Sequence, residues 1–175
     1  MAHDVFISHS SDDAAVAGQV CAALEDTGIR CWIAPRDILP GHSWSGAIVE
    51  GIDRCRVVMV VVSARANGSI EVAREVELAS RGRKTIVGLR VEDVLPSAGL
   101  GYFLSSTQWL DVFPPPVRPH LDRLVKVVTS LLGVEALTPV ASQRREPEFV
   151  EVDLDDFSRS GRRRRGIVQR WFEDR

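Results

Sequence analysis

The sequence lacks long hydrophobic runs and a strong excess of either charge. Its longest uninterrupted apolar stretch, Val57–Val62, has six residues, whereas a membrane-spanning helix needs about 20. The 22 basic and 24 acidic side chains give a net charge of −2 at pH 7, so no overall basic field is present to attract nucleic acid. We therefore expect no membrane span and no direct nucleic-acid partner.

The sequence contains only three cysteines, an odd number. The three cysteines form no CxxC motif, and the four histidines show no metal-ligand spacing. This pattern favours free, buried thiols in a reducing cytoplasm over a disulfide framework or a zinc site. The N-terminus also lacks the basic-then-apolar pattern of a signal peptide. We expect a cytoplasmic protein with no bound metal or cofactor.

Hydrophobic patterning predicts strands and helices in alternation. Short apolar runs favour five strands, at 5–8, 29–33, 56–62, 84–90 and 108–111. Helical spacing of apolar residues predicts the connecting segments, at 12–28, 43–52, 70–81 and 117–132. No tight hairpin signal joins successive strands. The pattern predicts an α/β fold with a doubly wound, parallel, five-stranded sheet and helices on both faces.

Sheets of this kind bind ligands outside the carboxyl ends of their strands. In this sequence, the residues that directly follow the first predicted strand are polar. Ser8, His9 and Ser10 directly follow the first strand. Beside the N-terminus of the next helix, these side chains and the backbone N–H groups suit an anion such as a phosphate. The same residues also fit a hydrogen-bonded capping turn with no ligand.

The loop after the second strand, Trp32–Gly41, is a second candidate. It combines a large flat ring, two prolines and the Arg36–Asp37 dipeptide. A stacked base and a held phosphate need such parts. Alternatively, Trp32 is a core residue and the two charged side chains pair with each other.

The predicted helix 70–81 carries the third candidate. Glu71 and Glu75 are four residues apart and therefore lie on one face as a like-charge pair. Arg74 and Arg81 can offset other charges of the helix. Glu75 has no basic partner one turn away, which makes it the carboxylate most available for chemistry.

Residues 134–175 differ in character from the rest. Six of the eleven residues in 146–156 are acidic, and four arginines follow at 162–165. We expect a domain over 1–133 and a charged linker or docking tail over 134–175, leading to a partner or to a truncated domain.

Three motifs resemble those of bacterial TIR (Toll/interleukin-1 receptor) domains in order and spacing, and the resemblance runs from about residue 4 to 132. They are DVFISHS at 4–10, GIRCWIAPRDILPG at 28–41 and REVE at 74–77. The resemblance implies a flavodoxin-like fold, the TIR fold, which agrees with the predicted sheet.

The resemblance also implies an activity, cleavage of the ribosyl–nicotinamide bond of NAD⁺ as substrate. Glu75 matches the family's catalytic glutamate. The matching substrate-binding positions are Ser8, His9, Trp32, Arg36, Asp37 and Glu71. Water capture would give ADP-ribose, and capture within the molecule a cyclic ADP-ribose. Many catalytic relatives carry tryptophan where this chain has Glu71, so the site departs from the family pattern there.

Alternatives remain at this point. TIR domains usually become active when copies assemble, so the resemblance implies a homo-oligomer. It also implies a sensor or effector protein as a possible partner, and a role in antiphage defence in bacteria. The chief alternative is a non-catalytic TIR–TIR interaction module. A phosphoacceptor receiver domain would need acidic residues after the first and third strands, where this chain has Ser8 and Ser63. A nucleoside deoxyribosyltransferase-like enzyme is a more distant alternative that shares glycosidic chemistry, but the motif at 34–41 favours the TIR resemblance.

Overall fold

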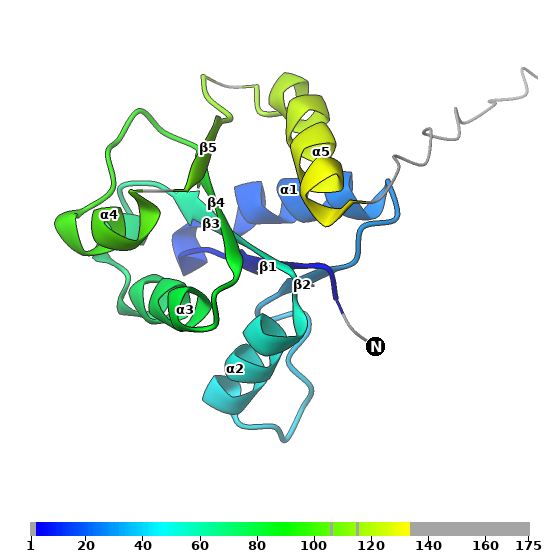
Figure 1. Ribbon diagram of the computed structural model, residues 1–175, viewed down its shortest axis with the longest axis vertical. Helices are drawn as coiled ribbons and strands as arrows, with labels where there is room; N and C mark the ends of the chain where they lie inside the picture. Colours follow the sequence, from blue (N-terminus) through cyan, green and yellow to red (C-terminus); the bar gives the residue numbers. More distant parts are fainter. Residues whose placement is uncertain (1–2, 106, 115, 134–175) are drawn as a thin grey trace, which may run out of the picture. The chain divides into compact units, whose positions relative to one another are not determined.

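The computed structural model describes residues 3–105, 107–114 and 116–133. Strands and helices alternate through this part of the chain (Figure 1). The strands are β1 Val5–Ser8, β2 Cys31–Ile33, β3 Val57–Val62, β4 Thr85–Arg90 and β5 Gln108–Asp111. The helices are α1 Ala14–Glu25, α2 Trp44–Arg54, α3 Ile70–Arg81, α4 Ala98–Leu104 and α5 Arg118–Leu132. The predicted charged tail, 134–175, lies outside the described residues.

The five strands form one parallel sheet in the order β2-β1-β3-β4-β5. The chain moves from β1 to β2 on one side and then crosses back to β3 on the other. The strand order therefore reverses between β1 and β3, which is the switch point of a doubly wound sheet. The predicted fold class is confirmed.

The central strand β3 shows how the sheet divides the core. All six of its residues are buried, and alternate side chains point to opposite faces. Val57, Met59 and Val61 pack with residues of α1 and α5. Val58 and Val60 pack with residues of α2, α3 and α4. The two groups of helices cover opposite faces of the sheet (Figure 1).

Helix α4 is the element that the sequence pattern missed. Its seven residues include two glycines, which lower helix propensity. The Ser97 hydroxyl accepts a hydrogen bond from the Leu100 N–H at 3.5 Å, and Leu100 and Leu104 are buried. Tertiary packing and a cap therefore form a helix that local propensity does not favour.

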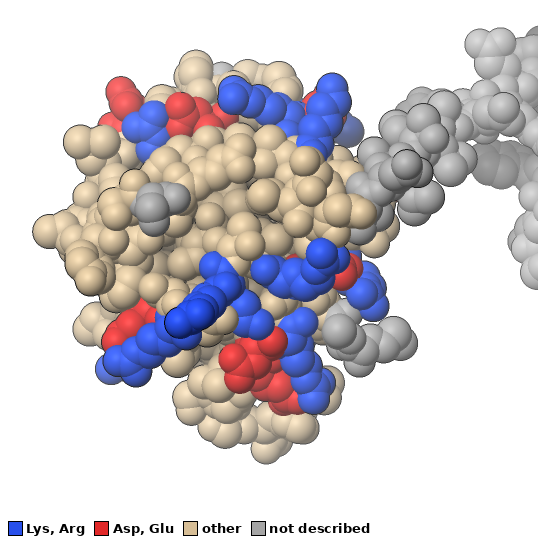
Figure 2. Space-filling model, in the orientation of Figure 1, with Lys and Arg blue, Asp and Glu red and all other residues tan. Residues whose placement is uncertain are grey.

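Charged side chains are mixed on the face shown in Figure 2, where basic and acidic groups lie beside one another. Arg90 pairs with Asp111 across neighbouring strands at 2.7 Å, and Arg81 pairs with Glu77 one turn away at 2.6 Å. Among the helices of the described residues, none combines the length and apolarity that crossing a bilayer requires.

Candidate functional site

A cleft of about 750 Å³ opens at the carboxyl ends of β1 and β3. It therefore lies at the switch point of the sheet, where ligands of doubly wound folds bind. Segments after β1, β2 and β3 contribute to its wall, together with α2 and α3. The residues used below are His9, Pro35, Trp44, Arg65, Glu71 and Glu75.

Glu75 is the buried carboxylate of this cleft. Helix α3 begins with the Ser69 hydroxyl accepting from the Val72 N–H at 3.3 Å, and it buries Val72 and Val76 against the sheet. Glu75 lies beside that apolar stripe and is only 8% exposed. The Ser8 hydroxyl, at the end of β1, donates a hydrogen bond of 2.5 Å to its Oε2. The fold thus joins two predicted site residues that are 67 positions apart in sequence.

The environment of Glu75 favours its neutral form. Burial raises the pKa of Glu75, because a carboxylate loses solvation inside the protein. The hydrogen bond from Ser8 lowers this pKa, and the nearby charge of Glu71 raises it. The net result is a pKa of about 7 for Glu75. The group therefore changes charge near neutral pH, as a tuned active-site carboxylate does.

His9 joins the segments that follow β1 and β2. Its ring nitrogens lie 2.6 Å from the Ser10 carbonyl oxygen and 3.1 Å from that of Ala34. Both neighbours are acceptors, so a neutral ring can satisfy one of them and an imidazolium ring both. His9 lines the cleft and holds the start of the 34–41 loop in place.

A buried polar network that sequence reasoning missed supports the floor of the cleft. Asp13 Oδ2 accepts hydrogen bonds from Ser10 and from Ser63, each at 2.6 Å. Ser63 Oγ in turn accepts from the N–H groups of Arg65 and Ala66, at 3.1 and 3.0 Å. The network ties the ends of β1 and β3 to the start of α1. Serines at both strand ends were its signal in the sequence.

Trp32 lies in the core rather than in this cleft. Its ring stacks on Phe6 with centroids 4.7 Å apart and an interplanar angle of 10°, and it is 5% exposed. Trp32 therefore does not face Glu75, and the structure does not bring these two predicted site residues into one cleft. The reason is the alternation of β2, which turns this ring under α2.

Arg36 and Asp37 also point away from the Glu75 cleft. The guanidinium of Arg36 pairs with Glu25 of α1 at 2.8 Å and with Asp37 at 2.9 Å. Asp37 accepts a hydrogen bond from the Ile33 N–H at 2.8 Å. Both carboxylates raise the pKa of Arg36. These contacts fix the loop to β2 and α1, and they direct both side chains away from the cleft.

Trp44 is the exposed aromatic side chain of the cleft, whose lining also includes the buried Phe6. It is the first residue of α2, after a cap in which Ser43 Oγ accepts from the Gly46 N–H. Its ring is 54% exposed and lines the cleft, as Glu71 does. A half-exposed tryptophan in a concave site offers a flat surface for a base or a nicotinamide ring. Sequence reasoning included it in the predicted helix 43–52 and did not assign it to the site.

The fold and the cleft define a doubly wound domain with a buried acidic site at the switch point. A family model described as the TIR domain matches residues 5–125, which is most of the chain. The chain belongs to the TIR domain family.

Solved structures share this fold. The chain is similar to the TIR domain of the Toll-related receptor TRR-2 from Hydra magnipapillata, with 23% identity, a TM-score of 0.61, and coverage of 72% of this chain and 98% of that one. It is also similar to the CMP N-glycosidase BcmB from Clostridium botulinum, with 14% identity, a TM-score of 0.52, and coverage of 71% and 98%. The chain is similar as well to the RPS4 and RRS1 TIR domain heterodimer, with 15% identity, a TM-score of 0.58, and coverage of 75% of this chain and 99% of that one. A sequence search of curated proteins found no match.

Proposed function

We propose that this TIR domain cleaves the ribosyl–nicotinamide bond of NAD⁺, with Glu75 as the catalytic carboxylate. The observation that carries the proposal is a single buried glutamate, hydrogen-bonded to Ser8 and facing a cleft at the switch point. The cleft is of a size that ligand pockets usually have. The fold is shared with a protein named as an N-glycosidase, which acts on the same class of bond.

The proposed reaction needs an ionised carboxylate rather than a proton donor. Nicotinamide leaves as a neutral group from a cationic ring, so the departing nitrogen requires no proton. The ribosyl carbon becomes oxocarbenium-like as the bond breaks, and a nearby carboxylate stabilises that positive charge. In our proposal the ionised Glu75 does this while Ser8 orients it. Water then captures the ribosyl centre to give ADP-ribose, or an internal nucleophile gives a cyclic product.

Trp44 and the remaining predicted residues take different parts in this proposal. Trp44 supplies the aromatic wall that Glu71 does not, and it stacks on a ring of the substrate. Glu71 raises the pKa of Glu75 and so limits the active fraction below neutral pH. His9 lines the cleft and binds substrate there. Arg36, Asp37 and Trp32 act by holding the loop and α2 in place.

Self-assembly is part of the proposal, since the 34–41 loop borders the cleft through Pro35 and carries the 63% exposed side chain of Leu39. We further propose that the protein works in the cytoplasm as an immune effector or signal producer, triggered by a sensor partner. The alternative is a TIR–TIR scaffold without catalysis, which the exposed Leu39 would serve equally well.

The test is NAD⁺ consumption by the purified full chain at high concentration, with products resolved by chromatography. Glu75→Gln should lower the rate about 100-fold or more, because an amide cannot stabilise the developing charge. Glu77→Gln is the matched control, since this carboxylate lies on the same helix and pairs with Arg81 at the surface. The wild-type rate should rise as the pH passes through about 7, where Glu75 ionises.

Two outcomes would decide against the proposal. Equal rates for the wild type and Glu75→Gln would remove Glu75 from the mechanism. Intact NAD⁺ with the wild type under crowded conditions that promote assembly would favour the scaffold alternative.

A further inference from the structure

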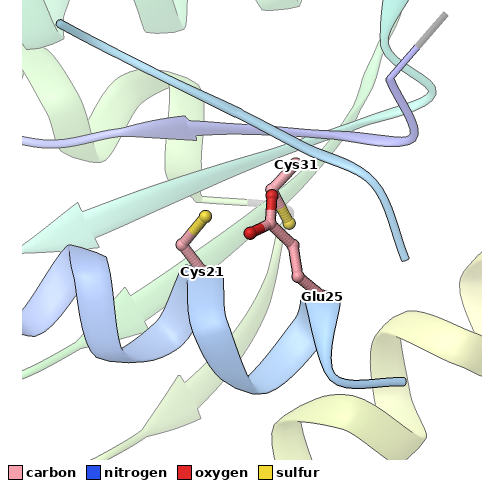
Figure 3. A group of neighbouring side chains, drawn as sticks. All are labelled: Cys21, Glu25 and Cys31. Atoms are coloured by element: carbon pink, nitrogen blue, oxygen red, sulfur yellow. The ribbon is translucent and has the colours of Figure 1, made fainter. Parts of the chain in front are cut away.

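A second cluster of reactive side chains lies between α1 and β2, and it lines none of the Glu75 cleft. Cys21 and Glu25 are one turn apart on α1, and Cys31 begins β2. Figure 3 shows both sulfurs and the carboxylate gathered in the space between the helix and the strand. The two Sγ atoms and a Glu25 oxygen all lie within 4.8 Å of one another.

This cluster already accommodates a positive charge. Arg36 Nη1 lies 3.4 Å from Cys21 Sγ and 2.9 Å from Glu25 Oε2. Arg36 Nη2 donates to Glu25 Oε1 and to the Cys31 carbonyl oxygen, each at 2.8 Å. The guanidinium therefore bonds to the side chains or backbone of all three residues. Cysteines that serve only as apolar filling need no such partner.

One side of the cluster borders the surface. A surface pocket of about 300 Å³ is lined by Glu25, Cys31 and Arg36. The side chain of Arg36 is 46% exposed, so it can turn outward into solvent. It would keep its ion pair with Asp37, which now measures 2.9 Å.

We propose that Cys21, Glu25 and Cys31 form a binding site for a thiophilic divalent cation such as Zn²⁺, which replaces the Arg36 guanidinium. Two thiolates and one carboxylate are zinc ligands, and water from the pocket takes the fourth position. In a tetrahedral site with Zn–S near 2.3 Å, ligand atoms are roughly 3.3–3.8 Å apart. Contraction from the present spacing, which is at most 4.8 Å, needs the ligand atoms to move closer by about 1 Å.

The net charge of the whole protein does not change in this exchange. One divalent cation enters, and the two thiols each release a proton to solvent as they form bonds to the metal. Arg36 moves aside and keeps its ion pair with Asp37, and the metal with its two thiolates and one carboxylate carries one net negative charge. The sequence spacing gave no such expectation, because two ligands lie one helical turn apart and the third is on a neighbouring strand.

The test is metal binding by the full chain, purified under reducing conditions and stripped of metal. Co²⁺ serves as a spectroscopic probe, and Zn²⁺ affinity is measured by competition with a chromophoric chelator. We expect one equivalent of Co²⁺ with a thiolate-to-cobalt charge-transfer band. Cys55→Ser is the matched control and should bind like the wild type, since Cys55 is a free buried thiol outside the cluster.

Two kinds of variant separate a real site from adventitious binding. Cys21→Ser and Cys31→Ser should each weaken Zn²⁺ binding more than about 100-fold, beyond the roughly 10–100-fold effect of outer-shell changes. Arg36→Gln should strengthen binding, because it removes the competing cation, and this result does not depend on the folding of the cysteine variants. Unchanged affinity in Cys21→Ser, weaker or unchanged affinity in Arg36→Gln, or a Co²⁺ spectrum without thiolate bands would overturn the proposal.

Discussion

At the scale of single residues, the burial of Glu75 makes a prediction about stability that is independent of catalysis. The pKa of Glu75 is about 7 in the fold and 4.5 in an unfolded chain. Because the folded state holds this proton more tightly, the stabilisation is complete below pH 4.5 and is lost as the pH rises through 7. Above that pH, ionised Glu75 lowers the free energy of unfolding by about 3 kcal/mol.

Glu75→Gln removes this ionisation and keeps an oxygen that can accept from Ser8. We expect the variant to exceed the wild type in unfolding free energy at pH 8.5, and the two to converge at pH 5. Urea unfolding at both pH values measures the difference. Glu77→Gln should show no such pH-dependent difference in unfolding free energy from the wild type, because that carboxylate pairs with Arg81 at the surface. The same difference between Glu75→Gln and the wild type at both pH values would contradict a raised pKa.

At the scale of elements, the close packing of α2 against Trp32 depends on Gly51. A Cβ atom at Gly51 would lie 2.9 Å from two atoms of the Trp32 ring and 3.3 Å from Phe6. That ring is stacked and buried, so it cannot yield easily. Gly51→Ala should therefore destabilise the domain by about 1–3 kcal/mol, despite the better helix propensity of alanine.

Denaturant midpoints check this prediction against a neighbour in the same helix. A Cβ at Gly46 would meet only Ser43, at an ordinary contact distance of 3.5 Å. Gly46→Ala should be neutral or stabilising by up to about 1 kcal/mol. If both variants had the same stability, the close approach of α2 to Trp32 would not limit packing.

The elements also show where sequence reasoning stops. The apolar run of β3 and the Ser69 cap of α3 are local signals, and both elements were predicted within a residue or two. Trp32, Arg36 and Asp37 belong to one sequence motif, yet they turn away from Glu75. Their directions depend on side-chain alternation and on partners such as Glu25, which is 11 residues away from Arg36. The bond between Ser8 and Glu75 joins distant segments, so only the fold reveals it.

At the scale of the whole molecule, the question is whether the cleft works alone. Trp44 at one wall is 54% exposed, and Leu39 on the preceding loop is 63% exposed. Apolar side chains beside a site gain stability when a second copy covers them. If assembly is part of the proposed activity, NAD⁺ cleavage per molecule should rise with protein concentration rather than stay constant.

Leu39→Glu tests this link, because a charge on the loop opposes burial between copies. We expect the variant to lose the concentration-dependent part of the rate, at least about tenfold, and to remain a folded monomer by light scattering. Leu95→Glu is the matched control, since Leu95 is 78% exposed and lines none of the Glu75 cleft. A rate per molecule that does not vary with concentration would separate catalysis from assembly. Equal loss in both variants would mean that the surface near the cleft has no special part in assembly, and the 34–41 loop would then serve only to position β2 and α1.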